Sequence, residues 1–172
     1  MKFNTSNKEV LVAKSNKFNL DKNDLNILKS FATSNISGKS RICSHKNDTD
    51  LLHEMFIFHK RDYYVRPHRH FNKSESIMIL KGKVDLVLFN DDGVVQDVIH
   101  LDEFLSGKKF YNRINEPIFH TLIIKSNYVI FYEATTGPFN KKDTEFAEWS
   151  PKINTPESKI FMKNISNDIT KL

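Results

Sequence analysis

The first periodic pattern of apolar residues in this chain has helical spacing. Leu25, Leu28 and Phe31 recur at intervals of three, directly after a group of polar residues suited to capping a helix. This pattern predicts a short helix over about residues 21–33, with Gly38 in the linker that follows it. Before the helix, a short apolar patch at residues 10–12 could add an edge strand to a sheet.

From residue 41 onward, the chain consists of short β-favouring runs separated by turn residues, and the apolar positions follow a period of two. Together with the entering strand at 41–45, the expected strands are residues 51–59, 62–70, 75–80, 83–89, 94–101, 119–125 and 128–135. Seven or more short strands at this spacing predict an all-β sandwich or barrel.

Short turns between these runs predict hairpins. We expect Lys81-Gly82 to join the strands on either side of it, and Ser126-Asn127 to do the same later in the chain. Asp91-Asp92-Gly93 is the turn signal before the returning strand at 94–101. Residues 104–114, which contain Gly107, are expected to be irregular.

A chain of 172 residues has the size of one domain. We expect an N-terminal extension with the short helix (1–40), a β-barrel (41–138), and a C-terminal extension that packs on the barrel and ends in a tail (139–172). Within the last part, 146–149 could form a helical turn. The tail from Thr155 is expected to be a loose arm or a partner-binding segment.

The charge of the chain narrows the choice of partners. There are 26 Lys and Arg residues against 21 Asp and Glu, and the basic excess is spread over the whole length. No basic run marks a nucleic-acid surface, so we expect no nucleic-acid partner. The single cysteine, Cys43, excludes an internal disulfide and fits a reducing compartment. Without a signal-peptide-like start or a span-length apolar run, we expect a soluble, cytoplasmic protein that does not insert into membranes.

One stretch carries a candidate metal site. His68 and His70 are two positions apart, so a strand would place both imidazoles on one face. Glu75 follows, and it shares its face with Ile77 and Ile79, where a carboxylate is costly unless it is paired or metal-bound. Two imidazoles and a carboxylate are typical ligands of a transition metal.

The spacing from His68 and His70 through Glu75 to Gly82 resembles the first signature motif of the cupin superfamily. Pro117-Ile118-Phe119-His120 stands about where the second cupin motif would fall. The resemblance implies a double-stranded β-helix, or jelly-roll barrel, with His120 as a fourth ligand. It also implies one divalent transition metal (Fe, Mn, Ni or Zn) with open coordination positions, and a homodimer.

The chain also resembles the WbuC family of cupin-fold metalloproteins, from about residue 19 to residue 151. The matching pieces are residues 41–45, 52–55, 64–70, 73–76, 81–82, 89–93, 137–139 and 146–151. Members of that family are often encoded among genes for surface polysaccharide biosynthesis, such as that of the lipopolysaccharide O-antigen. The resemblance implies a metal site and a biosynthetic context, and it implies no particular reaction.

Further residues are candidates for contact with a substrate. Arg41, Arg66 and Arg69 could bind an anionic group. Glu133 could act as an acid or base, the alternative being an exposed strand residue. Tyr64 could either pack or donate a hydrogen bond near the site, which makes it a second catalytic candidate.

Among the other histidines, one of His53 and the neighbouring Glu54 should point inward and the other outward. We expect His59 and His100 at the surface. A metal site from Cys43 and His45 would have too few ligands.

The leading hypothesis is a metal-dependent enzyme that acts on a sugar or nucleotide-sugar of surface polysaccharide assembly, as an isomerase or epimerase. A metal with open positions can polarise a carbonyl beside an acidic C–H bond. An Fe(II)-dependent oxygenase is the alternative within the enzyme class. A non-enzymatic sugar-binding or regulatory cupin module is the alternative outside it.

Overall fold

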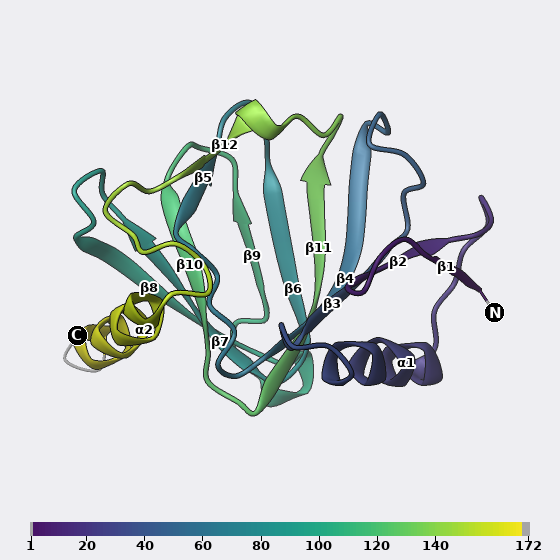
Figure 1. The fold of residues 1–172 in the computed structure, drawn as a ribbon, viewed down its shortest axis with the longest axis horizontal. Helices are drawn as coiled ribbons and strands as arrows, with labels where there is room; N and C mark the ends of the chain where they lie inside the picture. Colours follow the sequence, from purple (N-terminus) through teal and green to yellow (C-terminus); the bar gives the residue numbers. More distant parts are fainter. Residues whose placement is uncertain (1, 170–172) are drawn as a thin grey trace.

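Two β-sheets face each other in the computed structural model, which describes residues 2–169 (Figure 1). The strands of the first sheet are β1 (Phe3–Thr5), β2 (Val10–Ala13), β3 (Lys39–Cys43), β4 (Leu52–Lys60), β6 (Glu75–Lys81), β9 (Tyr111–Ile114) and β11 (Tyr128–Thr136). The strands of the second sheet are β5 (His68–His70), β7 (Lys83–Phe89), β8 (Val95–Asp102), β10 (Phe119–Ile124) and β12 (Thr144–Phe146).

The strand orders show repeated crossing between the sheets. The seven-stranded sheet has the order β1-β2-β3-β4-β11-β6-β9, and the five-stranded sheet has the order β12-β5-β10-β7-β8. Within the described residues, all pairings except the parallel β2–β3 pair are antiparallel. The predicted all-β jelly-roll class is therefore confirmed. The division into parts at residues 40 and 138 stays a prediction, and β1 and β2 extend the seven-stranded sheet beyond it.

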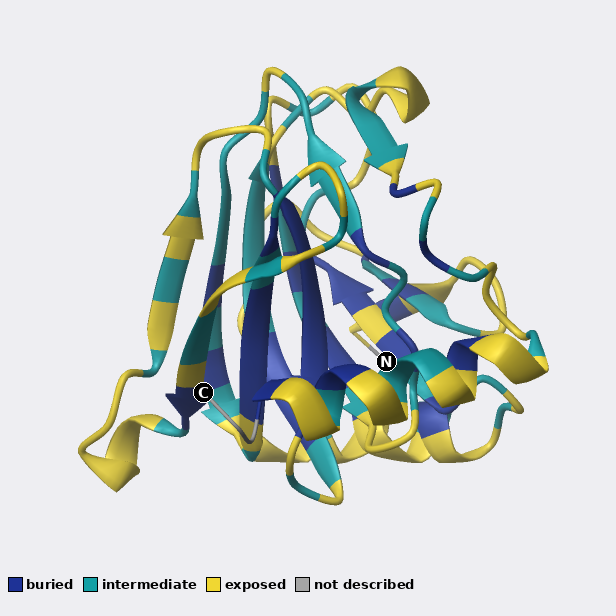
Figure 2. Cartoon of the chain, turned by 90° about the vertical axis from the view of Figure 1, so that its left-hand side faces the viewer, coloured by how far each residue is buried: buried dark blue, intermediate teal, exposed yellow. Residues whose placement is uncertain are grey.

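The core between the sheets follows the period of two. Odd-numbered residues of the seven-stranded sheet, such as Ile57, Ile79 and Phe131, face even-numbered residues of the five-stranded sheet, such as Leu86 and Leu122. In Figure 2 the buried residues, in dark blue, lie mainly on the strands. Because each strand alternates its side chains, the outer faces carry a second set of apolar residues that other elements must cover.

Helix α1 (Lys22–Thr33) covers the outer face of the seven-stranded sheet, as Figure 1 shows at its lower right. The Asp21 side chain accepts from the backbone N–H of Asp24, and the Asp24 side chain accepts from the N–H of Asp21, which forms a capping box. Leu28 and Ala32 are fully buried and belong to the cluster that contains Phe58 of β4. The predicted helix is confirmed within one residue.

The C-terminal tail is a helix and not the predicted loose arm. Helix α2 (Pro156–Ile169) buries Ile165 and Ile169 in a cluster with Val87 and Phe119 on the outer face of the five-stranded sheet. This apolar face needed a cover, and the spacing of the apolar residues of the tail provides one. Residues 170–172 lie outside the described residues. Neither α1 nor α2 combines the length and the apolar character that crossing a membrane would need.

Two of the three predicted hairpins are wrong. β6 pairs with β9 and β11, whereas β7 pairs with β8 and β10, so Gly82 lies at a corner where the chain passes from one sheet to the other. The same holds for Ser126, between β10 and β11. Strands at such corners are apolar on both faces, so a tight turn between two apolar runs does not reveal whether they pair.

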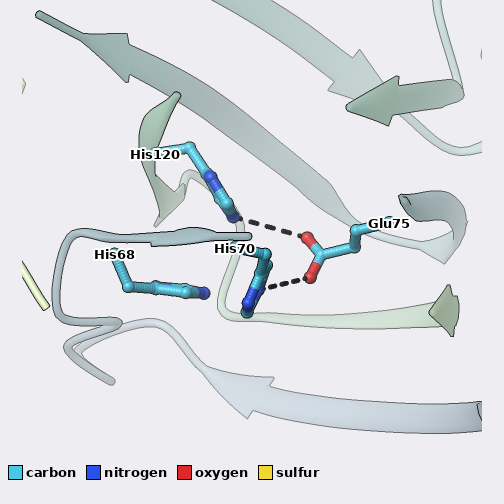
Figure 3. A group of neighbouring side chains, drawn as sticks. All are labelled: His68, His70, Glu75 and His120. Carbon is cyan, nitrogen blue, oxygen red and sulfur yellow. Dashed lines mark ion pairs between the residues drawn. The ribbon is translucent and has the colours of Figure 1, made fainter. Parts of the chain in front are cut away.

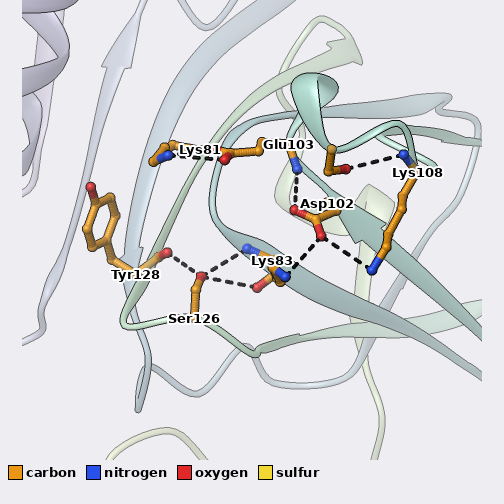
Figure 4. A network of polar contacts seen from close by, with 8 residues as sticks. Lys81, Lys83, Asp102, Glu103, Lys108, Ser126 and Tyr128 are labelled. Carbon is orange, nitrogen blue, oxygen red and sulfur yellow. Dashed lines mark hydrogen bonds and ion pairs between the residues drawn. The ribbon is translucent and has the colours of Figure 1, made fainter.

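The two corners pack against each other (Figure 4). The Ser126 hydroxyl accepts from the Lys83 N–H at 2.9 Å and donates to the Tyr128 carbonyl at 2.6 Å. Gly82 has φ +91°, and a Cβ there would lie 2.4 Å from the Tyr128 carbonyl oxygen. Only a glycine fits this position without displacing its neighbours.

Three further segments differ from their predictions. Only His68–His70 of the expected strand at 62–70 is a strand, and the region expected to be irregular contains β9, which pairs with β6. The turn expected at 146–149 begins one residue later, because Phe146 ends β12 and pairs with His68, and the Ser150 N–H then donates to the Ala147 carbonyl at 3.2 Å. The hairpin of β7 and β8 around Gly93 and the strand at 10–12 are confirmed.

Candidate metal centre

His68, His70, Glu75 and His120 meet at one point between the two sheets (Figure 3). β5 carries the first two histidines, β10 carries His120 opposite His68, and Glu75 begins β6 of the other sheet. One potential ligand atom from each residue can be chosen so that all four lie within 4.8 Å of one another. The structure therefore brings together the four residues that the sequence and its resemblance to cupins predict as metal ligands.

Each histidine is held through its Nδ1 atom. Nδ1 of His68 lies 2.8 Å from the Arg66 carbonyl oxygen, and that of His120 lies 2.9 Å from the Ile118 carbonyl oxygen. A carbonyl only accepts, so both Nδ1 atoms donate, and in the neutral ring Nε2 carries the lone pair. Nδ1 of His70 lies 3.0 Å from the Thr144 hydroxyl oxygen. Such anchoring of the outer nitrogen is typical of metal-binding histidines.

The carboxylate of Glu75 bridges two of the imidazoles. Its oxygens lie 3.1 Å from Nε2 of His70 and 3.5 Å from Nε2 of His120. Burial alone would raise the pKa of Glu75, but the hydrogen bonds of His120 and His70 and the charges of His120 and His68 outweigh it, so the pKa lies well below its usual range. Burial likewise opposes the charged form of His120, yet the Glu75 carboxylate raises the pKa of that imidazole.

His68 behaves in the opposite way, because burial and the neighbouring His120 lower its pKa to about 4. It is therefore neutral at physiological pH, with its Nε2 lone pair available. Nε2 of His120 is buried, and among the described residues it meets no polar atom closer than the Glu75 carboxylate at 3.5 Å. Three imidazole nitrogens and one carboxylate oxygen, with their outer atoms anchored, fit a divalent transition metal and leave coordination positions for a further ligand.

The cluster lines a cavity of about 360 Å³. The opposite wall is the inner face of the seven-stranded sheet, which contributes the polar residues Arg41, His53, His59 and Glu133. A second cavity of about 420 Å³ shares part of this lining, including Arg41, His59 and Glu133, and extends toward Glu9 and Ile153. The candidate centre is therefore reached from a space much larger than a metal ion.

Glu133 points into this cavity, so the alternative of an exposed strand residue is wrong. Burial and the charge of Glu75 raise the pKa of Glu133 well above its usual range, against the opposing effect of Arg41. Burial beside the charge of Glu75 therefore favours the protonated form of this carboxyl group. A carboxyl group with a raised pKa is a typical proton donor.

Tyr64 lies away from the cavity, which removes the geometric basis for its predicted catalytic role. Its hydroxyl donates to the Pro151 carbonyl at 3.0 Å, and its ring makes an edge contact with Phe161 of α2. The neighbouring Tyr63 lines the second cavity instead, and its ring centroid lies 4.4 Å from that of His59. The sequence does not indicate whether Tyr63 or Tyr64 faces the cavity. The residues just before β5 form no strand, so the period of two does not apply to them.

The three candidate arginines differ in their surroundings. Arg69 forms ion pairs with Glu145 at 2.8 Å and Asp91 at 2.7 Å, outside both cavities. Arg66 lines the second cavity, but it is engaged by Ser150 and by the carbonyl of Ala147. Arg41 lines both cavities. Of the three, Arg41 is therefore placed best to meet a substrate.

Two histidines of the cavity wall, His53 and His59, were not predicted as site residues. His59 was expected at the surface, but it is half-buried and lines both cavities, so this expectation is wrong. His53 is the inward member of the His53–Glu54 pair, as one of the two had to be. Both histidines follow the period of two of the apolar residues Met55 and Ile57, and this pattern could have predicted that they face inward. His100 is exposed as expected.

Comparison with known proteins places the fold. A family described as "Domain of unknown function (DUF6016)" matches residues 20–101. No curated protein matches the chain. Protein SO0799 of Shewanella oneidensis is similar in structure, with a TM-score of 0.52 and 10% identity over 65% of this chain and 75% of that one.

Two other solved structures are more distant. CapF, crystallised with the inhibitor 3-isopropenyl-tropolone, has a TM-score of 0.49 at 18% identity and covers 63% of this chain and 32% of its own. A sugar phosphate isomerase from the cupin superfamily of Silicibacter pomeroyi has a TM-score of 0.41 at 14% identity, over 51% of this chain and 52% of that one. At such identities the likeness concerns the fold alone. The protein has a cupin-type jelly-roll fold.

Proposed function

We propose that this protein is a metal-dependent enzyme that acts on a sugar or nucleotide-sugar as an isomerase or epimerase. The observation that carries the proposal is the meeting of four candidate metal ligands with Glu133, a carboxyl group whose pKa is raised by burial, at one cavity. A purely structural metal would need no cavity and no proton donor. The resemblance to the WbuC family supports a place in surface polysaccharide assembly in the cytoplasm.

The residues have distinct parts in this proposal. His68, His70, Glu75 and His120 would hold a divalent metal, which would supply a Lewis acid for a carbonyl or hydroxyl oxygen of the substrate. Glu133 would donate its proton to the carbonyl oxygen of the substrate, and the carboxylate that results would take up the proton of the neighbouring C–H bond, because a raised pKa makes this group a ready donor and its conjugate base a ready acceptor. Met55, Leu122 and Phe131 line the same cavity and would limit the access of water.

Metal analysis tests the first half of the proposal. We expect about one equivalent of iron, manganese, nickel or zinc in the purified protein, and loss of that metal in the His68→Ala/His70→Ala variant. His100→Ala removes a surface histidine far from the cluster and should retain the metal. Absence of metal from the wild type, even after reconstitution with each of the four ions, would overturn the proposal.

Solvent exchange tests the second half. Metal-loaded protein in D2O, incubated with a panel of sugar phosphates and nucleotide-sugars, should incorporate deuterium at a carbon next to a carbonyl of one of them. Glu133→Gln should bind the metal normally and slow this exchange about a hundredfold or more, since positioned acid–base groups contribute this much. A protein that binds metal and a sugar but never exchanges a proton would instead be a binding module.

A further inference from the structure

The imidazole of His53 has no polar partner although it is buried. Only 6% of the residue is exposed, and its Nε2 atom has no hydrogen-bond partner among the described residues. Leaving such a group unpaired in a protein interior is energetically costly. His53 lines the cavity but is outside the metal-ligand cluster, so the metal does not account for it.

His53 faces the same space as the candidate metal ligands. It pairs with Thr135 of β11, and Thr135 pairs with Glu75 of β6. His53, Thr135 and Glu75 therefore form one row across the seven-stranded sheet, with their side chains on the same face. A small molecule bound at the metal would have its next group over this row.

Neighbouring residues fix the His53 ring in place. The ring of His45 stacks on it with a centroid distance of 4.0 Å, and Nδ1 of His45 accepts from the backbone N–H of Glu54 at 3.2 Å. Gly137 lies beside it, and a Cβ at that position would be 2.9 Å from Nε2 of His53. The absence of a side chain at Gly137 is therefore what leaves room for the imidazole.

Arg41 completes this wall. Its side chain lines the cavity, and within residues 2–169 it makes no hydrogen bond or ion pair. Burial and the proximity of His53 lower the pKa of His45, with a further contribution from Arg41. Three groups that donate hydrogen bonds or carry positive charge are thus gathered in one wall of the cavity.

Charged residues line the rest of the cavity. The cations are Arg41 and Lys73, and the acidic residues are Asp48, Glu133 and the metal-cluster residue Glu75. A bound divalent metal would offset the charge of Glu75. Arg41, with the imidazoles of His45 and His53 in the same wall, is therefore the part of the lining suited to negatively charged oxygens.

We propose that Arg41, His45 and His53 form an anion subsite that binds a phosphoryl group of the substrate. A phosphoryl group offers several acceptor oxygens, which suits the guanidinium fork and the unpaired Nε2 of His53. The subsite extends the proposed function by assigning a phosphorylated substrate. Only the identity of the molecule that carries the phosphoryl group rests on the proposed function. The binding of the anion itself needs no metal.

The test titrates inorganic phosphate into full-length protein from which metal has been removed with a chelator, and follows binding by calorimetry and by NMR of the histidine side chains. We expect saturable binding to the wild type that Arg41→Gln and His53→Gln each weaken tenfold or more. Arg41→Lys, which keeps the charge, should recover part of the affinity. His100→Gln is the surface control and should bind like the wild type.

The His68→Ala/His70→Ala variant separates this proposal from the metal proposal. It should keep its affinity for phosphate, whatever it does to the metal content. Loss of phosphate binding in that variant, with full binding in Arg41→Gln, would place the anion at the metal ligands and overturn the subsite. Equal affinity for acetate and phosphate would contradict a phosphoryl site, and absence of saturable phosphate binding would overturn it outright. Arg41 is an exposed residue, so Arg41→Gln remains informative even where His53→Gln fails to fold.

Discussion

Single buried side chains give the cavity its polarity, and His59 shows the energetic consequence. Burial, followed by the charges of Lys39 and Arg41, lowers the pKa of His59 to about 3. Its Nδ1 atom is buried without a hydrogen-bond partner among the residues described. The folded protein therefore keeps this imidazole neutral at pH values where an unfolded chain would protonate it.

The stability of the metal-free protein should decrease in acid because of His59. The unfolded chain takes up a proton near pH 6.5 and the folded protein only near pH 3, so between these values stability falls as the pH falls. The contribution of one such group is up to about 1.4 kcal/mol per pH unit. His59→Phe should lose this contribution, measured by urea unfolding of chelator-treated protein from pH 7.5 to 5. Above pH 7 the two proteins should share one slope, and equal slopes below pH 6.5 would contradict the prediction.

Elements are joined in this fold by corners whose geometry is demanding. Gly82 combines a positive φ with backbone and side-chain atoms of Ser126 and Tyr128 within 2.5 Å of a notional Cβ. Gly107 also has a positive φ, of +72°, but a Cβ there would meet nothing within 4 Å. Substitutions at these two glycines therefore distinguish the energetic cost of the left-handed conformation from the energetic cost of the steric contact.

Gly82→Ala should destabilise the protein much more than Gly107→Ala. A left-handed conformation alone costs an alanine about 1–2 kcal/mol, and the clash at the corner adds to it. We expect a difference of about 2 kcal/mol or more in the free energy of unfolding, measured with a chemical denaturant. Equal losses for the two variants would show that the corner yields without strain.

Helix α2 offers a second test at the level of elements. Ile165 is 6% exposed and packs on the five-stranded sheet, whereas Ile160 of the same helix is 61% exposed. Ile165→Ala should cost about 2–4 kcal/mol, as is usual for a buried isoleucine, and Ile160→Ala should stay within about 0.5 kcal/mol. Thermal unfolding of both variants measures this. Two small effects would indicate that the helix does not hold to the barrel in solution.

For the molecule as a whole, the candidate metal centre lies where the two sheets meet. His68, His70 and His120 belong to the five-stranded sheet, and Glu75 belongs to the seven-stranded one. A metal held by all four would connect the sheets directly. Metal binding should therefore stabilise the global fold and not a single loop.

Adding the cognate metal to chelator-treated protein should raise its melting temperature. A ligand at a thousand times its dissociation constant stabilises a folded protein by about 4 kcal/mol, provided that it does not bind the unfolded chain. His68→Ala/His70→Ala should show no such shift, and His100→Ala should respond like the wild type. A similar shift in the double variant would place the stabilising ion elsewhere.

Local patterns in the chain were sufficient for several features. The capping residue Asp21 and the apolar spacing after it predict α1, and the period of two predicts most strands. The histidine pair and Glu75 are close in the chain, so their convergence needs only one strand and the beginning of the next. These features depend on backbone conformation and side-chain alternation within a few residues, which the local sequence controls.

Other features depended on contacts between distant segments. The strands on either side of Gly82 belong to different sheets, and the face of β4 that carries His53 and His59 lines a cavity only because β5 and β10 lie opposite. Likewise, α2 is held by an apolar sheet face far from it in the chain. The sequence by itself determined the elements, their apolar faces and the local ligand motif. Only the tertiary structure decided which apolar faces pack against each other, because each buried surface is formed by segments that lie far apart in the chain and share no local pattern.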